Sequence, residues 1–98
     1  VIDESNELKV LAPATAIFYS TPSPSEPEYV NVGDRIRLQE TLCQLEAMKM
    51  FTPLSLADFN TESVLYADSE YEVTRINMGN GQQVNVGDLL FVVKPLAD

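Results

Sequence analysis

Glu46-Ala47-Met48-Lys49-Met50 is the stretch of this sequence whose residue types and spacing best suit chemistry. A strand predicted from Thr41 to Ala47 ends there, and an extended pattern resumes from Met50 toward Leu56, which predicts a hairpin with Met48-Lys49 as its two-residue turn. Such turns favour Asn-Gly and other pairs that tolerate positive φ, so Met-Lys breaks the local rule. A rule broken without visible compensation is expected at a functional site.

Lys49 would stand at the tip of that hairpin, where another enzyme can reach its amine without unfolding the chain. The amine can form an amide once an enzyme removes its proton, since a free lysine has a pKa near ~10.4. Met48 and Met50 are flexible and polarizable, which suits a surface that several partners must contact. A single lysine alone predicts only a solvated surface residue. Five specified residues, however, arise by chance at a given position on the order of 1 in 10⁶, at roughly 5% usage of each type.

Other chemistry is excluded by composition. The chain has no His and a single Cys, Cys43, so it can build neither a Ser-His-Asp triad nor a zinc site. Its 98 residues make one domain without room for a conventional enzyme cleft, so we do not expect an enzyme. The balance of 15 acids against 6 bases, a net charge of −9, argues against nucleic acid or an anionic membrane surface and favours basic protein partners.

The sequence also bears on the compartment. No apolar run approaches the roughly 20 residues that span a bilayer, and no signal peptide is visible. Cys43 has no partner for an intramolecular disulfide, which favours a reducing compartment. We therefore expect a bacterial cytoplasmic protein or one inside an organelle, and not a secreted one. Because the chain begins at Val1 rather than Met, we expect a processed form or a piece of a longer polypeptide.

The elements that must position Lys49 are predicted to be strands, with no helix. Short apolar stretches, several alternating with a period of two, are separated by the turn signals Gly33-Asp34, Met78-Gly79-Asn80-Gly81 and Gly87-Asp88. This spacing predicts an all-β sandwich or barrel. The predicted strands are Leu8 to Leu11, Ala16 to Tyr19, Ile36 to Leu38, Thr41 to Leu45, Tyr71 to Ile76 and Leu89 to Val93.

One internal repeat refines the prediction. Val30-Asn31-Val32-Gly33-Asp34 recurs as Val84-Asn85-Val86-Gly87-Asp88, 54 residues later. The identity predicts two similar, interlocked halves related by a quasi-twofold axis. The alternative is that a common strand-to-turn phrase occurs twice.

These residues carry a family resemblance. Thr41-Leu42-Cys43-Gln44-Leu45-Glu46-Ala47-Met48-Lys49-Met50 resembles the biotinylation segment of biotin carboxyl carrier domains, whose attachment lysine lies in A-M-K-M. Phe18-Tyr19-Ser20-Thr21-Pro22-Ser23-Pro24 is similar to the strand and thumb loop of the carrier of bacterial and plastid-type acetyl-CoA carboxylase. Val32-Gly33-Asp34 and the run from Asn80 to Asp88 follow the same pattern, so the resemblance extends from about Val10 to Lys94. Lipoyl domains share the fold but usually carry D-K-A, so methionine on both sides of the lysine points to biotin.

The resemblance implies an architecture. It is a flattened barrel or sandwich of two four-stranded sheets with quasi-twofold symmetry, a biotinyl lysine at a hairpin tip and a thumb loop. We expect an N-terminal tail at 1–7, a biotinyl domain at 8–96 and the thumb at 20–28. The three prolines between Thr21 and Pro27 cannot donate to a ladder and stiffen the chain, which favours a projecting finger.

The resemblance also implies a function. A biotin protein ligase would attach biotin to Lys49, taking the formal charge from −9 to −10. The protein would then shuttle carboxybiotin between biotin carboxylase and carboxyltransferase sites, most simply those of an acetyl-CoA or acyl-CoA carboxylase. Glu46, Ala47, Met48 and Met50 would surround the cofactor attachment, and the thumb would contact biotin through Thr21, Pro22, Ser23 and Pro24. The alternatives are a lipoyl carrier domain of a 2-oxo acid dehydrogenase and an unmodified hairpin that only mediates protein contacts.

The sequence departs from the family pattern in its second half. Thirty-three residues separate Met50 from Val84, more than the pattern leads us to expect, and Tyr71 or Glu72 stands where a glycine is usual. We place the surplus in an insertion at 57–70, as an extra hairpin or a longer loop. Such an insertion would offer partner enzymes additional surface without affecting the assignment of Lys49.

Overall fold

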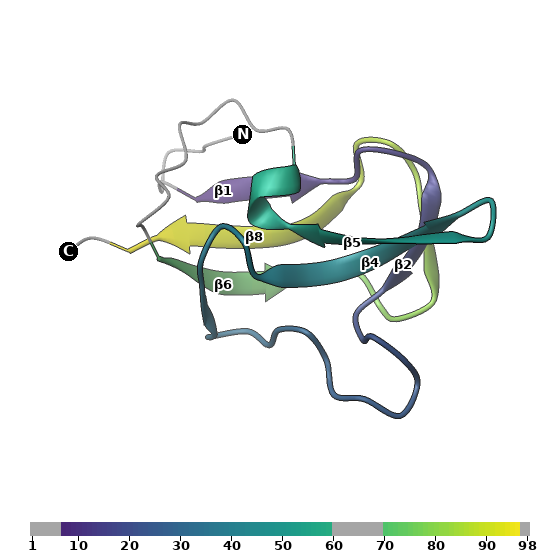
Figure 1. Cartoon of the computed structure of the whole chain (residues 1–98). Helices are drawn as coiled ribbons and strands as arrows, with labels where there is room; N and C mark the ends of the chain where they lie inside the picture. The colour runs from purple at the N-terminus through teal and green to yellow at the C-terminus, as the bar shows by residue number, and fades with distance from the viewer. Residues whose placement is uncertain (1–6, 60–69, 97–98) are drawn as a thin grey trace.

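The computed structural model describes residues 7–59 and 70–96 (Figure 1). Strands dominate this part of the chain because its apolar residues alternate with polar ones, which buries one face of each strand. The elements are β1 Leu8–Leu11, β2 Ala16–Tyr19, β3 Arg35–Ile36, β4 Thr41–Ala47, β5 Met50–Ser55, η1 Leu56–Asp58, β6 Tyr71–Ile76, β7 Gln82–Val84 and β8 Leu89–Pro95.

The strands form two antiparallel sheets of four strands each, with orders β1-β8-β6-β3 and β5-β4-β2-β7. Their inner faces enclose one hydrophobic core, in which the rings of Phe18 and Phe91 pack at a centroid distance of 5.7 Å. The predicted all-β sandwich is therefore confirmed. Its fully buried large side chains come from both sheets: Leu8, Val10, Phe18, Ile36, Leu42, Leu56, Val73, Val84, Leu90, Phe91 and Val93.

The quasi-twofold symmetry is also confirmed. Replacing each strand of β1-β8-β6-β3 by its counterpart in the other half of the chain gives β5-β4-β2-β7, which is the order of the second sheet. Each half therefore contributes two strands to each sheet, and the halves interlock. Neither half could bury its apolar face without the other.

The pentapeptide repeat, however, does not mark the symmetry-equivalent positions. Both copies form a similar turn, in which the Asn31 and Asn85 amides each donate to an aspartate Oδ2 three residues on, at 2.8 Å. Yet β4 begins at Thr41 and β8 at Leu89, 48 residues apart rather than 54. The turn that leads into β4 is formed by Arg37 to Glu40, whose amide nitrogens donate to Glu40 Oε2 and Arg37 O. This turn, which lacks the repeated sequence, is the counterpart of Asn85 to Asp88.

Several predicted boundaries were wrong. The strand expected from Ile36 to Leu38 is only Arg35–Ile36, because Leu38 is buried in the following turn, where its carbonyl accepts from the Ala57 amide at 3.0 Å. β7 was not predicted, since only Val84 of its three residues is buried. The strands β4 and β8 run two residues further than expected, to Ala47 and Pro95.

A short 3-10 helix, η1, stands where no helix was expected. Leu56 is buried, and the Asp58 carboxylate accepts from the backbone nitrogen and the Oγ of Ser55 at 2.8 and 2.9 Å. These two bonds, the backbone one first, lower the pKa of Asp58. η1 lies at the start of the insertion placed at 57–70, but residues 60–69 are outside the described part of the chain.

The hairpin of β4 and β5 extends furthest from the two ends of the described chain. In Figure 1, β1 begins and β8 ends on one side of the molecule, and the β4–β5 tip lies on the opposite side. The fold therefore presents this tip as one pole of an elongated body of 39 × 26 × 20 Å.

Replacing Phe91 by Ala should lower the free energy of unfolding by about 3–5 kcal/mol, because it leaves a cavity where the two sheets meet. Urea unfolding measures the change, and Val86→Ala, at a side chain that is 67% exposed, is the matched control with an expected change within about 0.5 kcal/mol. Equal effects of the two substitutions would contradict the assignment of this core.

Candidate functional site

The site is built on the hairpin of β4 and β5. The strands pair antiparallel from Ala47↔Met50 down to Thr41↔Ser55, which leaves Met48 and Lys49 as the two turn residues. The predicted two-residue turn is thus present, and both of its residues have positive φ, 53° at Met48 and 64° at Lys49. This is the left-handed backbone of the turns that fit the twist of a hairpin, which is why Asn-Gly is the usual sequence.

The turn is strained because neither residue suits it. A side chain in the left-handed region costs roughly 1–2 kcal/mol. No burial offsets this cost, since Met48 is 95% exposed and Met50 is 71% exposed. Lys49 is exposed between them, at the extreme tip. The structure therefore holds a lysine and two thioethers in water at a position where a glycine would be more stable.

One face of the hairpin carries an aromatic contact. The pleat places Glu46 and Phe51, which are paired across the two strands, on the outer face of the sheet. From the neighbouring strand β2, Tyr19 Oη donates to Glu46 Oε1 at 2.8 Å, and the Tyr19 ring packs against Phe51 with centroids 5.7 Å apart. The hydrogen bond to Glu46 is the main cause that raises the pKa of Tyr19. The sequence pointed to Glu46 but not to Tyr19 or Phe51; only the pairing of β2 with β4 brings these two aromatics together.

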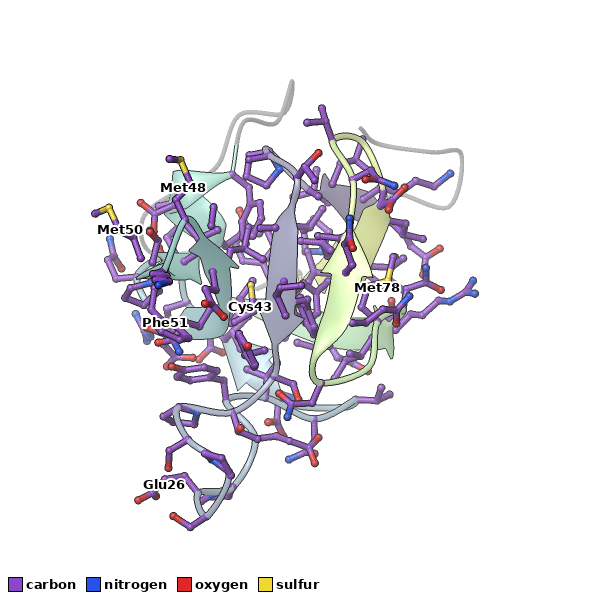
Figure 2. All side chains as sticks on the ribbon, turned by 90° about the vertical axis from the view of Figure 1, so that its right-hand side faces the viewer. Glu26, Cys43, Met48, Met50, Phe51 and Met78 are labelled. Carbon is purple, nitrogen blue, oxygen red and sulfur yellow. The ribbon has the colours of Figure 1, made fainter. Side chains whose placement is uncertain are left out.

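The thumb projects beside this face. Its base is closed by a hydrogen bond from the Tyr29 amide to Ser20 O at 2.8 Å, and Asn80 Oδ1 accepts from the Ser20 amide at 2.8 Å. Figure 2 shows the loop extending away from the sandwich, with Glu26 near its outer end. The predicted finger is therefore a loop anchored at its base, with one internal turn from the Glu26 amide to Ser23 O.

A hollow of about 310 Å³ lies between the thumb and the hairpin. It contains all four thumb residues predicted from the sequence, and hairpin and β2 residues complete it. The lining residues are Tyr19, Thr21, Pro22, Ser23, Pro24, Gln44, Phe51 and Asn80.

The opposite face of the hairpin has a different character. Ala47 and Met50, the pair that closes the turn, lie on the side of the sheet that faces the core, beyond the edge of the other sheet. Here an apolar groove of about 300 Å³ is lined by Pro13, Ala14, Ala16, Leu45, Ala47, Met50, Thr52 and Leu54. The structure thus separates the predicted site residues: Glu46 and the thumb lie on one face, Ala47 and Met50 on the other, and Lys49 at the tip between them.

The described residues offer little other chemistry. Residues 7–59 and 70–96 contain no group of three or more His, Cys, Asp or Glu that could hold a metal ion. Cys43 is buried, and its burial raises the pKa of the thiol to about 12, so the thiolate that would act as a nucleophile does not form.

No helix within the described segments is long and apolar enough to cross a membrane.

The fold and the site define a class: a small domain of two interlocked four-stranded sheets that presents one lysine on a strained hairpin. The family model described as "Biotin-requiring enzyme" matches residues 8–58, more than half of the chain. The chain therefore belongs to the biotin-requiring enzyme family.

Curated relatives resemble most of the chain. It is 34% identical over 87 residues to the biotin carboxyl carrier protein of acetyl-CoA carboxylase from Nostoc sp., covering 89% of this chain and 42% of the relative. The chloroplastic counterpart from Glycine max is 30% identical over 84 residues, covering 86% and 28%. The counterpart from Haemophilus influenzae is 29% identical over 92 residues, covering 94% and 52%. The chain thus spans only about a quarter to a half of the length of these relatives.

Replacing Met48 by Asn together with Lys49 by Gly should raise the free energy of unfolding by about 1–2 kcal/mol, because this pair adopts the turn without strain. Urea unfolding again provides the measurement. The control is Met48→Ala with Lys49→Ala, which keeps a Cβ at both positions and should bring no gain. If both double variants are equally stable, backbone strain at the tip is not the cause.

Proposed function

We propose that this chain is a biotin carrier domain, in which Lys49 holds biotin through an amide bond. The domain presents this group in turn to the biotin carboxylase and carboxyltransferase sites of an acetyl-CoA or acyl-CoA carboxylase, and it makes no bonds itself. The observation that carries the proposal is the strained tip, where Lys49 is exposed at φ 64° in a chain of the biotin-requiring enzyme family. The relatives named above support acetyl-CoA as the acceptor.

The hollow beside the thumb fits the bicyclic ring of biotin. That ring has a polar ureido edge and an apolar thioether edge. The side chains of Thr21, Ser23, Gln44 and Asn80 can exchange hydrogen bonds with the first, and Tyr19, Phe51 and the two thumb prolines can contact the second. A volume of about 310 Å³ is also at the lower end of the range of small-molecule pockets, roughly 300–1,000 Å³. When bound, biotin supplies the ureido nitrogen that accepts and gives up a carboxylate.

The residues of the chain contribute position and access. The hairpin pole keeps Lys49 clear of the body of the domain, so both enzyme sites can be reached by the same arm. Tethering raises the local concentration of the group at each site to roughly millimolar. We assign Met48 and Met50 to contacts with partner enzymes rather than to folding, since both are exposed.

Attachment requires a partner as well. A biotin protein ligase has to remove a proton from the Lys49 amine before it can form the amide, and the product loses one positive charge. The acidic balance of the chain, −9 before attachment, favours partners with basic surfaces and disfavours nucleic acid and anionic membranes. The relatives include a bacterial and a chloroplastic protein, so we place the chain in the bacterial cytoplasm or inside an organelle.

Incubation with biotin protein ligase, ATP and biotin should add one biotin to the chain, and Lys49→Arg should accept none. Intact mass measures the addition and separates biotin from a lipoyl group. Lys94→Arg is the control: it changes a lysine that lies in β8, on the other sheet, and should be labelled at the rate of the unmodified sequence. Labelling that persisted in Lys49→Arg would refute the assignment.

Replacing residues 21–28 by Gly-Gly should preserve the fold and biotinylation but slow coupled carboxylation severalfold. The Tyr29 amide already donates to Ser20 O, which is the bond that closes a two-residue turn, so the shortened link fits the existing base. Loss of the thumb removes half of the lining of the hollow. Steady-state rates with the carboxylase subunits and NMR signals of the biotin ring measure the effect.

The control for this deletion is Ser25→Ala, at a thumb residue outside the hollow, which should leave both measurements unchanged. A shortened chain with full carboxylation activity and an unchanged biotin spectrum would mean that the thumb is only a loop.

A further inference from the structure

The sulfur atoms of this chain fall into two groups. It has three methionines and one cysteine. Met48 and Met50 are exposed on either side of Lys49, whereas Met78 is partly buried against the core and Cys43 is completely buried. Figure 2 shows the same separation, with the two thioethers projecting at the margin and Cys43 in the interior.

These environments predict which sulfur an oxidant reaches first. In a peroxide reaction the thioether sulfur attacks one peroxide oxygen and the O–O bond breaks. Methionine is oxidised to the sulfoxide, and hydrogen peroxide is reduced to water. Met48 and Met50 meet no steric barrier to this attack. Cys43 reacts only as a thiolate, which burial suppresses by raising the pKa of the thiol to about 12. The cysteine therefore does not compete for the oxidant.

We propose that Met48 and Met50 form a reversible oxidation site through which peroxide controls the access of carboxylase partners to Lys49. Met50 forms a wall of the apolar groove beside Pro13, Ala14 and Leu54, so a sulfoxide there places a strong dipole on an apolar surface. Met48 places a second dipole at the tip itself. A partner that buries these side chains must then desolvate polar groups without pairing them, which weakens the contact. Methionine sulfoxide reductases reverse the change with electrons from a dithiol.

The fold should survive this modification. Met48 and Met50 are absent from the buried core, and the turn they flank is held by the pairing of β4 with β5. Oxidation of Met78 would act differently, because its side chain packs against the core. The site can therefore switch contacts without unfolding the domain. The effect on carboxylase partners rests on the proposed function, whereas the order in which the sulfurs are oxidised does not.

The test uses the biotinylated chain, with intact mass recorded first to establish that Lys49 is loaded. Graded hydrogen peroxide, followed by peptide mass spectrometry, should show sulfoxide at Met48 and Met50 well before Met78, with Cys43 unmodified. At full oxidation of the pair, kcat/KM of biotin carboxylase for the carrier should fall about tenfold, mainly through KM, as expected when a polar group is buried unpaired. Circular dichroism should not change, and treatment with methionine sulfoxide reductases should restore kcat/KM.

Two variants locate the effect. Met48→Leu with Met50→Leu should start from its own lower rate and lose none of it in peroxide, while Met78→Leu should lose as much as the unmodified sequence. Oxidation of Met78 as early as the pair, an unchanged kcat/KM after oxidation of the pair, or continued peroxide sensitivity of the double leucine variant would each overturn the proposal. A chain that accepts no biotin before peroxide is added contradicts the proposed function instead.

Discussion

The burial of one face of β4 is the constraint on which the site depends. Leu42, Cys43 and Leu45 are fixed in the core between the two sheets, and β4 is paired on one side with β2 and on the other with β5. With β4 held in this way, β5 can return only through the two residues that remain, Met48 and Lys49. The strain in their backbone is small compared with the free energy that would be lost if β4 left the core. The core therefore imposes the left-handed turn, and the turn displays the lysine.

The same pairing gives the lysine two unlike neighbourhoods. Because side chains alternate across a strand, Glu46 and Phe51 face the thumb, and Ala47 and Met50 face the apolar groove. On the thumb side, hydroxyl and amide groups accompany the aromatic rings. On the groove side, Thr52 provides the one polar side chain of the lining. An arm attached at Lys49 thus stands at the boundary between a surface suited to a heterocycle and a surface suited to apolar contacts.

Much of this arrangement could be predicted from the sequence, because its signals are local. The alternation in β1, β2 and β6 gave their limits, and an unsuitable turn pair gave the position of the hairpin. What failed depended on distant contacts. β7 is mostly polar and becomes a strand only because β2 offers it an edge. The repeated pentapeptide reports a preferred turn rather than equivalence in the fold, which is why its spacing of 54 residues differs from the 48 between β4 and β8. The contact of Tyr19 with Phe51 likewise requires a register that no single segment contains.

Pro53 has a consequence for the behaviour of the domain at high concentration. β5 lies at an edge of its sheet, and Pro53 is paired with Gln44, three pairs below the turn. The pair that closes a two-residue turn is hydrogen-bonded and the pairs alternate, so the nitrogen of Pro53 points away from β4. An incoming strand would find no donor there, in the middle of the edge. The exposed strand that leads away from Lys49 is therefore a poor template for sheet extension, and the carrier can present apolar side chains to its enzymes without recruiting further copies of itself into an aggregate.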